Sequence, residues 1–325
     1  MAKLAAGIIG TGEVAETHAR VMAADGRARL AHVFNRTPER AERFAVRHGA
    51  TVLASAEALI DASDVVLICS PQHTHAAYAQ AALEAGKAVL CEKPGAISVA
   101  QARQLADRAE RSGAVYQAGF NRRFAPVYRE VGRLLASGEL RATSFQIKIN
   151  RGELEAPAWV SDRSLSGGFL FETTIHLLDM AQHLFGDVRI VAARGTQRVY
   201  DQPDNFSVLL ESAEGGHGGL TSAGHATWAY PFERVEVYGP QQTVATVELD
   251  AVVRTVGLRR ETVAKRFTTL PSEQRWGFAG QMETFLDRVT GRSPSYDRFA
   301  TSRDVVAAAA LAETLYAHAN GGAEG

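Results

Sequence analysis

A charged pair and a proline, Glu92, Lys93 and Pro94, follow directly on the apolar run 88–91. If that run is a strand of a parallel sheet, its carboxyl end opens onto the crevice in which such sheets bind their ligands. The Lys93 ammonium would then face both a cofactor and a substrate, where it can stabilise a developing oxyanion. The alternative is a solvated turn that Pro94 keeps rigid, because most charged pairs at strand ends do no more than that.

A second group of titratable side chains follows two consecutive glycines, Gly167 and Gly168. Glu172, His176 and Asp179 have i,i+4 and i,i+3 spacing, which places all three on one face of a predicted helix. His176 is the natural general acid or base, because its unperturbed pKa of about 6.5 is close to working pH and a carboxylate can orient its ring. The alternative is a structural histidine, which a lone histidine more often is. Because two carboxylates flank it and two glycines precede it, we predict His176 and Glu172 as catalytic residues.

The substrate pocket is expected to include Trp159, in the loop 157–163, whose alternative role is that of a hydrophobic anchor. Glutamate, histidine and aspartate on one stripe could also ligate a divalent ion, but no pair of Cys or His accompanies them, and we expect no metal site. The predicted substrate contacts are Lys93, Trp159, Glu172, His176 and Asp179.

The beginning of the chain contains a Gly-x-Gly-x-x-Ala sequence between an apolar run and a helical stretch. Gly10 permits the tight turn, Gly12 lets the backbone approach a pyrophosphate, and Ala15 keeps helix and strand close. The phosphates would lie at the helix N-terminus, which favours negative charge. His18, in the same helix, is interpreted as a packing or cap residue. The residues predicted to bind a dinucleotide here are Gly10, Thr11, Gly12, Glu13 and Val14.

The end of the second predicted strand, 30–34, indicates which dinucleotide binds. An NAD site usually has an acidic residue here for the ribose 2′-hydroxyl, but the sequence is Asn35, Arg36, Thr37 and Pro38. Arg36 offers a planar cation and Thr37 a hydroxyl, which suit a 2′-phosphate. The alternative is that Thr37 only caps the next helix and Arg36 lies in solvent. We expect NADP in preference to NAD, with NAD possible, and Asn35, Arg36 and Thr37 in the cofactor site.

Two further strand ends are expected to border the same crevice. Ser70, Pro71 and His75 follow the apolar run 65–69, and Asn121 follows the last strand of this region. His75 has an equal alternative as a helix-start histidine bonded to the backbone. These residues complete the predicted cofactor contacts, which also include Glu92 and Lys93: Ser70, Pro71, His75, Glu92, Lys93 and Asn121.

The elements that carry these residues indicate an α/β fold with two domains. Over residues 1–120, strands alternate with helices, which predicts a doubly wound parallel sheet of the Rossmann type. Residues 121–325 are predicted to form an α+β domain with a large, mostly antiparallel open sheet, because Phe145, Ile147 and Ile149 begin a period-two pattern. The C-terminal helix is expected to pack back on the first domain. Further strands are predicted at 188–199, 206–210, 218–228, 235–238 and 243–249.

The amino-acid composition limits which partners and which cellular compartment we expect for this protein. Lys and Arg total 35 against 36 Asp and Glu, a net charge of -1, so we expect no binding to nucleic acid or a membrane surface. Apolar runs stay well short of the ~20 residues that span a bilayer, and no signal region is apparent, which favours the cytoplasm.

Cys69 and Cys91 are interpreted as buried core thiols. The open sheet needs cover on both faces, which favours a homodimer or homotetramer through it.

Together, the sequences 10–15, 70–75, 92–94 and 167–179 resemble the signatures of the glucose-fructose oxidoreductase and inositol dehydrogenase (Gfo/Idh/MocA) family, in that family's order. The resemblance covers nearly the whole chain. It implies that Lys93 holds the reacting oxygen and the cofactor ribose, and that His176 shuttles the proton. There are two departures: Glu172 stands where the family usually has aspartate, and Thr174 stands where it usually has glycine.

The residues and the resemblance together predict an NAD(P)-dependent oxidoreductase. It would move hydride between the nicotinamide and a hydroxyl or keto carbon of a sugar, a cyclitol or a derivative. A second possibility is an enzyme that keeps NAD bound and oxidises a sugar transiently for elimination or glycoside cleavage. A third is a non-enzymatic sensor of the dinucleotide, but a sensor needs neither Lys93 nor His176.

Overall fold

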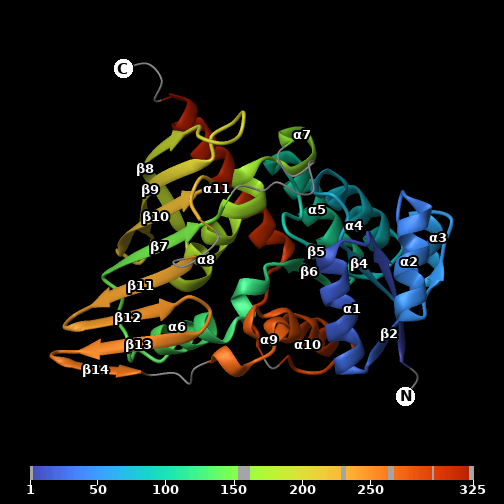
Figure 1. The fold of residues 1–325 in the computed structure, drawn as a ribbon, viewed down its shortest axis with the longest axis horizontal. Helices are drawn as coiled ribbons and strands as arrows, with labels where there is room; N and C mark the ends of the chain where they lie inside the picture. Colours follow the sequence, from blue (N-terminus) through green and yellow to red (C-terminus); the bar gives the residue numbers. More distant parts are fainter. Residues whose placement is uncertain (1–2, 153–161, 228–231, 263–266, 295, 322–325) are drawn as a thin grey trace. The chain divides into compact units, whose positions relative to one another are not determined.

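The structure is a computed structural model that describes residues 3–152, 162–227, 232–262, 267–294 and 296–321. It divides into two compact units (Figure 1). Unit 1 comprises Met1–Asn121 and Gly277–Ala307, and unit 2 comprises Arg122–Trp276 and Ala308–Gly325.

Unit 1 contains a six-stranded sheet in the order β3-β2-β1-β4-β5-β6, with every neighbouring pair parallel. The predicted doubly wound parallel sheet is thereby confirmed. Its central strands are buried on both faces: Ile8, Leu67 and Leu90 are at most 1% exposed. The strands are β1 (Leu4–Ile9), β2 (Ala28–Phe34), β3 (Thr51–Val52), β4 (Val65–Ile68), β5 (Ala88–Glu92) and β6 (Tyr116–Gly119).

Local sequence signals explain the helices of unit 1. In α5, the Ser98 side chain accepts a hydrogen bond from the Gln101 N–H, and Gly113 ends the helix in the left-handed region at φ 64°. Helix α10 lies far along the chain, yet Met282 and Phe285 belong to the apolar cluster that also contains Met22 of α1. These helices are α1 (Glu13–Asp25), α2 (Pro38–His48), α3 (Ala56–Ala62), η1 (Gln72–Thr74), α4 (His75–Glu84), α5 (Val99–Ser112) and α10 (Phe278–Val289).

Unit 2 contains an eight-stranded sheet in the order β14-β13-β12-β11-β7-β10-β9-β8. The sheet is antiparallel except for the parallel pair β7 and β10, which confirms the mostly antiparallel prediction. Phe145, Ile147 and Ile149 of β7 are buried, as their period-two spacing requires. The strands are β7 (Ser144–Asn150), β8 (Val188–Thr196), β9 (Asn205–Ser212), β10 (His217–Ala223), β11 (Glu233–Gly239), β12 (Gln242–Val247), β13 (Ala251–Val256) and β14 (Arg259–Thr262).

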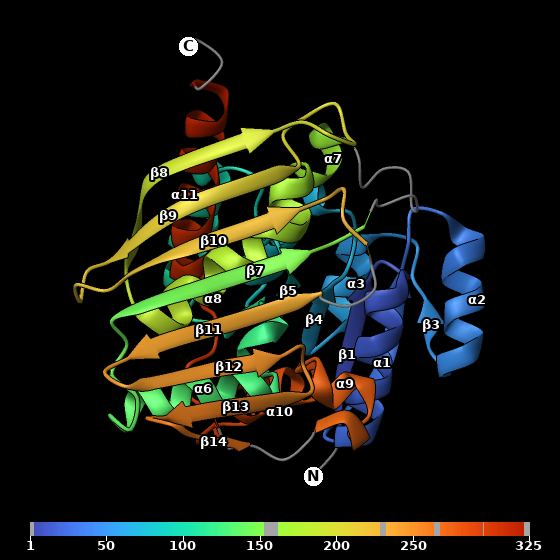
Figure 2. The same cartoon turned by 60° about the vertical axis from the view of Figure 1, so that its left-hand side comes forward.

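Helices α6, α8 and α11 of unit 2 lie over one face of this sheet (Figure 2). The rings of Phe145 in β7 and Phe185 in α8 stack with centroids 3.9 Å apart. Helix α11 contributes its first residues to unit 1 and the rest to unit 2. The remaining helices are η2 (Asn121–Phe124), α6 (Pro126–Ala136), α7 (Arg163–Ser166), η4 (Leu170–Thr174), α8 (Ile175–Phe185), η5 (Phe267–Thr269), α9 (Ser272–Arg275) and α11 (Ser302–Gly321).

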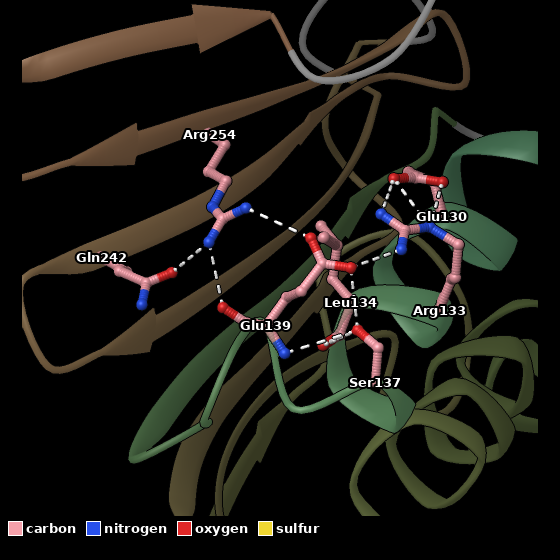
Figure 3. A network of polar contacts seen from close by, with 7 residues as sticks. All are labelled: Glu130, Arg133, Leu134, Ser137, Glu139, Gln242 and Arg254. Carbon is pink, nitrogen blue, oxygen red and sulfur yellow. Dashed lines mark hydrogen bonds and ion pairs between the residues drawn. The ribbon is translucent and has the colours of Figure 1, made fainter.

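A polar network ties the end of α6 to strands β12 and β13 (Figure 3). The Arg254 guanidinium donates to the Glu139 carbonyl at 3.0 Å and to the Gln242 side chain at 2.8 Å. Arg133 donates to the Glu139 carboxylate at 2.6 Å. The network thus anchors the turn between α6 and the sheet.

The two cysteines differ in burial. Cys91 is fully buried, as predicted, but Cys69 is only partly buried. The reason is that β4 ends at Ile68, so that Cys69 lies beyond the strand.

Across the described residues, no helix is both long and apolar enough to cross a membrane.

Candidate functional site

The glycine turn of unit 1 leaves room for a phosphate-bearing ligand. Gly10 has φ 100°, and a Cβ there would lie 2.4 Å from the Cys69 carbonyl oxygen, so that only glycine fits. Gly12 is the N-cap of α1 without a side-chain cap bond, and nothing lies within 4 Å of where its Cβ would be. The first N–H groups of α1 are therefore not covered by a capping side chain. This arrangement fits a pyrophosphate.

Asn35 connects this turn to the start of α2. Its Nδ2 donates to Thr11 Oγ1 at 2.5 Å, and its Oδ1 accepts from the Thr37 N–H at 2.9 Å. Thr37 is the N-cap of α2, but its side chain makes no cap hydrogen bond, and Arg36 is exposed. The Thr37 hydroxyl is thus not committed to capping α2.

The end of β4 is held by side-chain contacts to the backbone. Ser70 Oγ lies 2.7 Å from Thr74 Oγ1, and His75 is only 2% exposed. His75 Nδ1 lies 2.8 Å from the Pro94 carbonyl oxygen, and Nε2 lies 2.7 Å from the Ser70 carbonyl oxygen. Burial lowers the pKa of His75 below its ordinary value. A neutral imidazole has one N–H and donates to one of these two carbonyl oxygens. The ring nevertheless packs against backbone on both sides, which favours the structural alternative for this residue.

The end of β5 carries Glu92 and Lys93, whose peptide bond to Pro94 is cis. Glu92 Oε1 lies 2.8 Å from His18 Nε2, and Glu92 Oε2 accepts from the Lys93 N–H at 3.2 Å. Glu92 and His18 are 7% and 0% exposed, so that the pair is shielded from solvent. Lys93 is only partly buried. The carboxylate therefore fixes the backbone of Lys93 instead of lying in water.

The pairing of His18 was missed from the sequence, where this residue was interpreted as a packing or cap residue. The signal was its position on the face of α1 that also carries the buried residues Ala15, Ala19 and Met22. A polar side chain on a buried face needs a hydrogen-bond partner. The sequence alone does not show which residue that partner is.

In unit 2, the backbone before His176 differs from the regular helix expected. Gly167 and Gly168 have φ 76° and 86°, and Leu170–Thr174 forms a π-helical turn that leads into α8. Glu172 lies in this wider turn, while His176, 4% exposed, lies in the first turn of α8. The spacing argument for one α-helical face therefore applies to His176 and Asp179 but not to Glu172. Such π-helical turns occur frequently at functional sites.

Thr174 and Asp179 are both bound within unit 2. Thr174 Oγ1 lies 2.7 Å from Ser222 Oγ of β10, and both residues are fully buried. The Asp179 carboxylate, 0% exposed, accepts hydrogen bonds from Arg123. The larger side chain at Thr174, one of the two departures noted above, is thus matched by a hydroxyl partner.

Two further arginines were not singled out from the sequence. Arg122 forms an ion pair with Glu233 at 3.2 Å, and its guanidinium stacks 4.4 Å from the Trp276 ring centroid. The Tyr128 hydroxyl donates to the same Glu233 carboxylate. Burial lowers the pKa of Arg151, and the nearby Glu172 carboxylate opposes that shift. Each of these partners lies far away in the sequence, which explains why spacing alone did not reveal them.

The remaining residues predicted to contact cofactor or substrate include Asn121, Pro71 and Trp159. Asn121 is 2% exposed and ends unit 1, and Pro71 is the N-cap of η1. Trp159 lies outside the described residues. No group of three or more His, Cys, Asp or Glu side chains suited to a metal ion occurs in the part of the chain that the structure describes.

Comparisons with known proteins agree with this architecture. The model of an oxidoreductase family with an NAD-binding Rossmann fold matches residues 4–120, and that of the GFO/IDH/MocA C-terminal domain matches residues 128–245. Inositol 2-dehydrogenase of Rhizobium meliloti (strain 1021) is 29% identical over 86% of this chain and 87% of that protein. Inositol 2-dehydrogenase 2 of Saccharopolyspora erythraea is 30% identical over 94% of this chain and 90% of that protein. The solved structure of GenD2 from gentamicin A biosynthesis in complex with NAD has a TM-score of 0.83 at 26% identity, over 99% and 95% of the two chains.

Proposed function

Since the chain belongs to the GFO/IDH/MocA family of NAD-binding oxidoreductases, we propose that it transfers hydride between a nicotinamide cofactor and a hydroxyl or keto carbon of a sugar or cyclitol. The observation that carries this proposal is the end of β5. There, the buried His18–Glu92 pair fixes the backbone of Lys93, within the same unit as the uncapped glycine turn. The two inositol dehydrogenases named above support the substrate class.

In the proposed reaction, the nicotinamide supplies the redox chemistry. The Lys93 ammonium donates a hydrogen bond to the reacting oxygen and stabilises the charge that develops on it. His176 accepts the hydroxyl proton, and Glu172 assists by orienting the base or the substrate. The Arg123 guanidinium binds Asp179 one turn after His176. We therefore assign Asp179 a role in positioning α8, in addition to its predicted contact with the substrate.

We further propose a preference for NADP over NAD. The end of β2 has no acidic residue for a ribose 2′-hydroxyl, and Arg36 is exposed there with the Thr37 hydroxyl beside it. Because Asn35 holds the backbone of this segment, both groups are presented from a fixed turn. The similar protein GenD2 was solved in complex with NAD, so the test of this preference is to compare the kinetics of this protein with NAD and with NADP.

A homo-oligomer through the open sheet and a cytoplasmic location complete the proposal. Val191 of β8 and Leu209 of β9 are 42% and 43% exposed, so these neighbouring strands present apolar surface that a second copy would cover. The free thiols of Cys69 and Cys91 suit a reducing compartment. Sedimentation of the protein and of a Leu209→Glu variant tests the interface: the variant should dissociate, and a monomeric wild-type protein would contradict it.

The experiment is a panel of sugars and inositols, assayed with NAD⁺ and NADP⁺ by nicotinamide absorbance. Lys93→Met should abolish turnover and largely preserve dinucleotide binding. Lys87→Met is the matched control, because the Lys87 ammonium donates to the Asp61 carbonyl oxygen in an exposed contact. Normal turnover in Lys93→Met would contradict the proposal. Nicotinamide absorbance that copurifies with untreated protein, without net reduction, would instead indicate transient oxidation with a retained cofactor.

A further inference from the structure

The imidazole of His18 occupies a position that apolar packing alone does not explain. It is fully buried, and its ring meets that of Phe278 edge-on, with centroids 5.5 Å apart. Its Nε2 faces the Glu92 carboxylate, but its Nδ1 is buried with no hydrogen-bond partner among the described residues. A leucine would fill such a site without leaving a polar atom unsatisfied. The contact with Glu92 is therefore what distinguishes histidine here.

The Glu92 carboxylate contacts both His18 and the backbone of Lys93. In the tautomer that carries its proton on Nε2, His18 donates to Glu92 Oε1 across 2.8 Å. The other oxygen, Oε2, accepts from the Lys93 N–H at 3.2 Å. A Cβ at Gly119 of β6 would lie 2.6 Å from Glu92 Cα and 3.0 Å from Glu92 Cδ, so the β6 backbone packs directly against this side chain. Glu92 thus has little freedom to reorient.

His75 holds the other side of the same segment. Its Nδ1 lies 2.8 Å from the Pro94 carbonyl oxygen and its Nε2 lies 2.7 Å from that of Ser70, so the ring lies between the segments that follow β5 and β4. In the tautomer with its proton on Nδ1, the neutral ring donates to the Pro94 carbonyl. The residue is 2% exposed. Because Pro94 directly follows Lys93, the ring fixes the chain on the far side of the lysine from Glu92.

We propose that His18 and His75 are positioning residues for Lys93, which hold the segment 92–94 from helices α1 and α4 so that its ammonium is aligned for the reaction. This inference rests on the proposed function of Lys93. Neither imidazole contacts the substrate in this scheme. Their effect is on the geometry of the lysine, and small displacements of a reacting group are costly for rate.

A matched pair of variants at His18 tests the inference. In His18→Gln, the side-chain amide keeps a donor close to the place of Nε2, whereas His18→Leu keeps the bulk but removes the donor. We expect His18→Leu to lower kcat by about 10- to 100-fold. The Kd for NADPH, measured by fluorescence titration, should stay within about threefold, and His18→Gln should remain close to the wild-type protein in both quantities. Equal kcat values for the two variants would overturn the inference.

A second measurement does not depend on activity. The Lys93 amide hydrogen is held by Glu92, so its deuterium exchange should accelerate roughly tenfold in His18→Leu and remain slow in His18→Gln. The control is Ser55→Ala, which removes the cap of α3 elsewhere in unit 1 and should leave Lys93 exchange unchanged. Unchanged exchange in His18→Leu would contradict the positioning role.

Lys93→Met separates this inference from the proposed function. If Lys93→Met retains normal turnover, the catalytic role of Lys93 fails. If Lys93→Met is inactive and His18→Leu is as active as the wild-type protein, only the positioning role fails. His75→Leu should behave like His18→Leu, with a loss in kcat that exceeds any loss in NADPH affinity, and the reverse pattern would mark His75 as a cofactor contact.

Discussion

The guanidinium of Arg123 is bonded to both carboxylate oxygens of Asp179, with N–O distances from 2.5 to 3.2 Å. The two side chains are 5% and 1% exposed. The preceding residue, Arg122, pairs instead with Glu233 of β11. Two consecutive arginines therefore tie the segment 121–124 to the sheet and to α8. Because His176 lies one turn before Asp179, the Arg123–Asp179 pair also fixes the position of the proposed base.

Asp179→Asn should strongly destabilise the protein. The substitution preserves volume but leaves the Arg123 guanidinium buried without its countercharge, which costs about 3 to 5 kcal/mol. Urea unfolding followed by circular dichroism measures this loss. Glu130→Gln is the control: it breaks an ion pair in which Arg133 is 50% exposed, and should cost less than about 1 kcal/mol. Equal losses in the two variants would show that the burial of the pair does not matter.

Arg36→Ala should change cofactor preference. If Arg36 binds a 2′-phosphate, the variant loses a charge-assisted contact, and KM for NADPH should rise about 10- to 100-fold. KM for NADH should change little, because NADH lacks that phosphate. Steady-state kinetics with both cofactors provide the comparison, and Arg40→Ala, an exposed arginine of α2, is the control. A similar rise in both KM values would remove the NADP preference.

Sequence patterns predicted those features of unit 1 that depend on neighbouring residues. The parallel sheet over residues 1–120 and the tight turn at Gly10 follow from local hydrophobicity and backbone preference. Pairs distant in the chain were not predictable in this way. His18 and Glu92 are 74 residues apart, and Arg123 and Asp179 are 56 apart, so only the fold brings them together.

The π-helical turn at 170–174 shows a second kind of limit. The i,i+4 spacing of Glu172 and His176 is compatible with a regular α-helix, and no residue type in the sequence marks the wider turn. Nor does the amphipathic pattern of α10 show which unit it packs against: Met282 and Phe285 are apolar at helical spacing, which reveals a buried face but not its partner.

Thr174 and Ser222 should be energetically coupled. Their hydroxyl oxygens are 2.7 Å apart and buried, so either alanine variant leaves one hydroxyl without its partner, at a cost of about 1 to 3 kcal/mol. In the double variant no unpaired hydroxyl remains, and its loss should be smaller than the sum by about 1 kcal/mol. Thermal and urea unfolding of the three variants give the cycle, with exposed Ser207→Ala as control. Strict additivity would contradict the pairing.

Both cysteines should resist alkylation in the folded protein. Burial raises the pKa of the Cys91 and Cys69 thiols well above the ordinary value, and the Glu92 carboxylate adds to both shifts. A raised pKa leaves the neutral thiol in place at about pH 8, so little of the reactive thiolate forms. Iodoacetamide labelling read by mass spectrometry should modify both residues in denaturant and neither in buffer. Selective labelling of Cys69 would show that its partial exposure outweighs its raised pKa.

His176→Asn should lower kcat by about 10²- to 10⁴-fold, because the amide cannot accept the hydroxyl proton at working pH. Dinucleotide binding should be preserved, since no predicted cofactor contact of unit 1 is altered. The variant should also lose the limb of the pH–kcat profile that reports an essential base, which a mere loss of stability would not remove. His217→Asn, an exposed histidine at the start of β10, serves as the control and should retain the wild-type profile. If His176→Asn keeps both the rate and the limb, the base must be sought elsewhere, and Glu172 is then the next carboxylate to substitute.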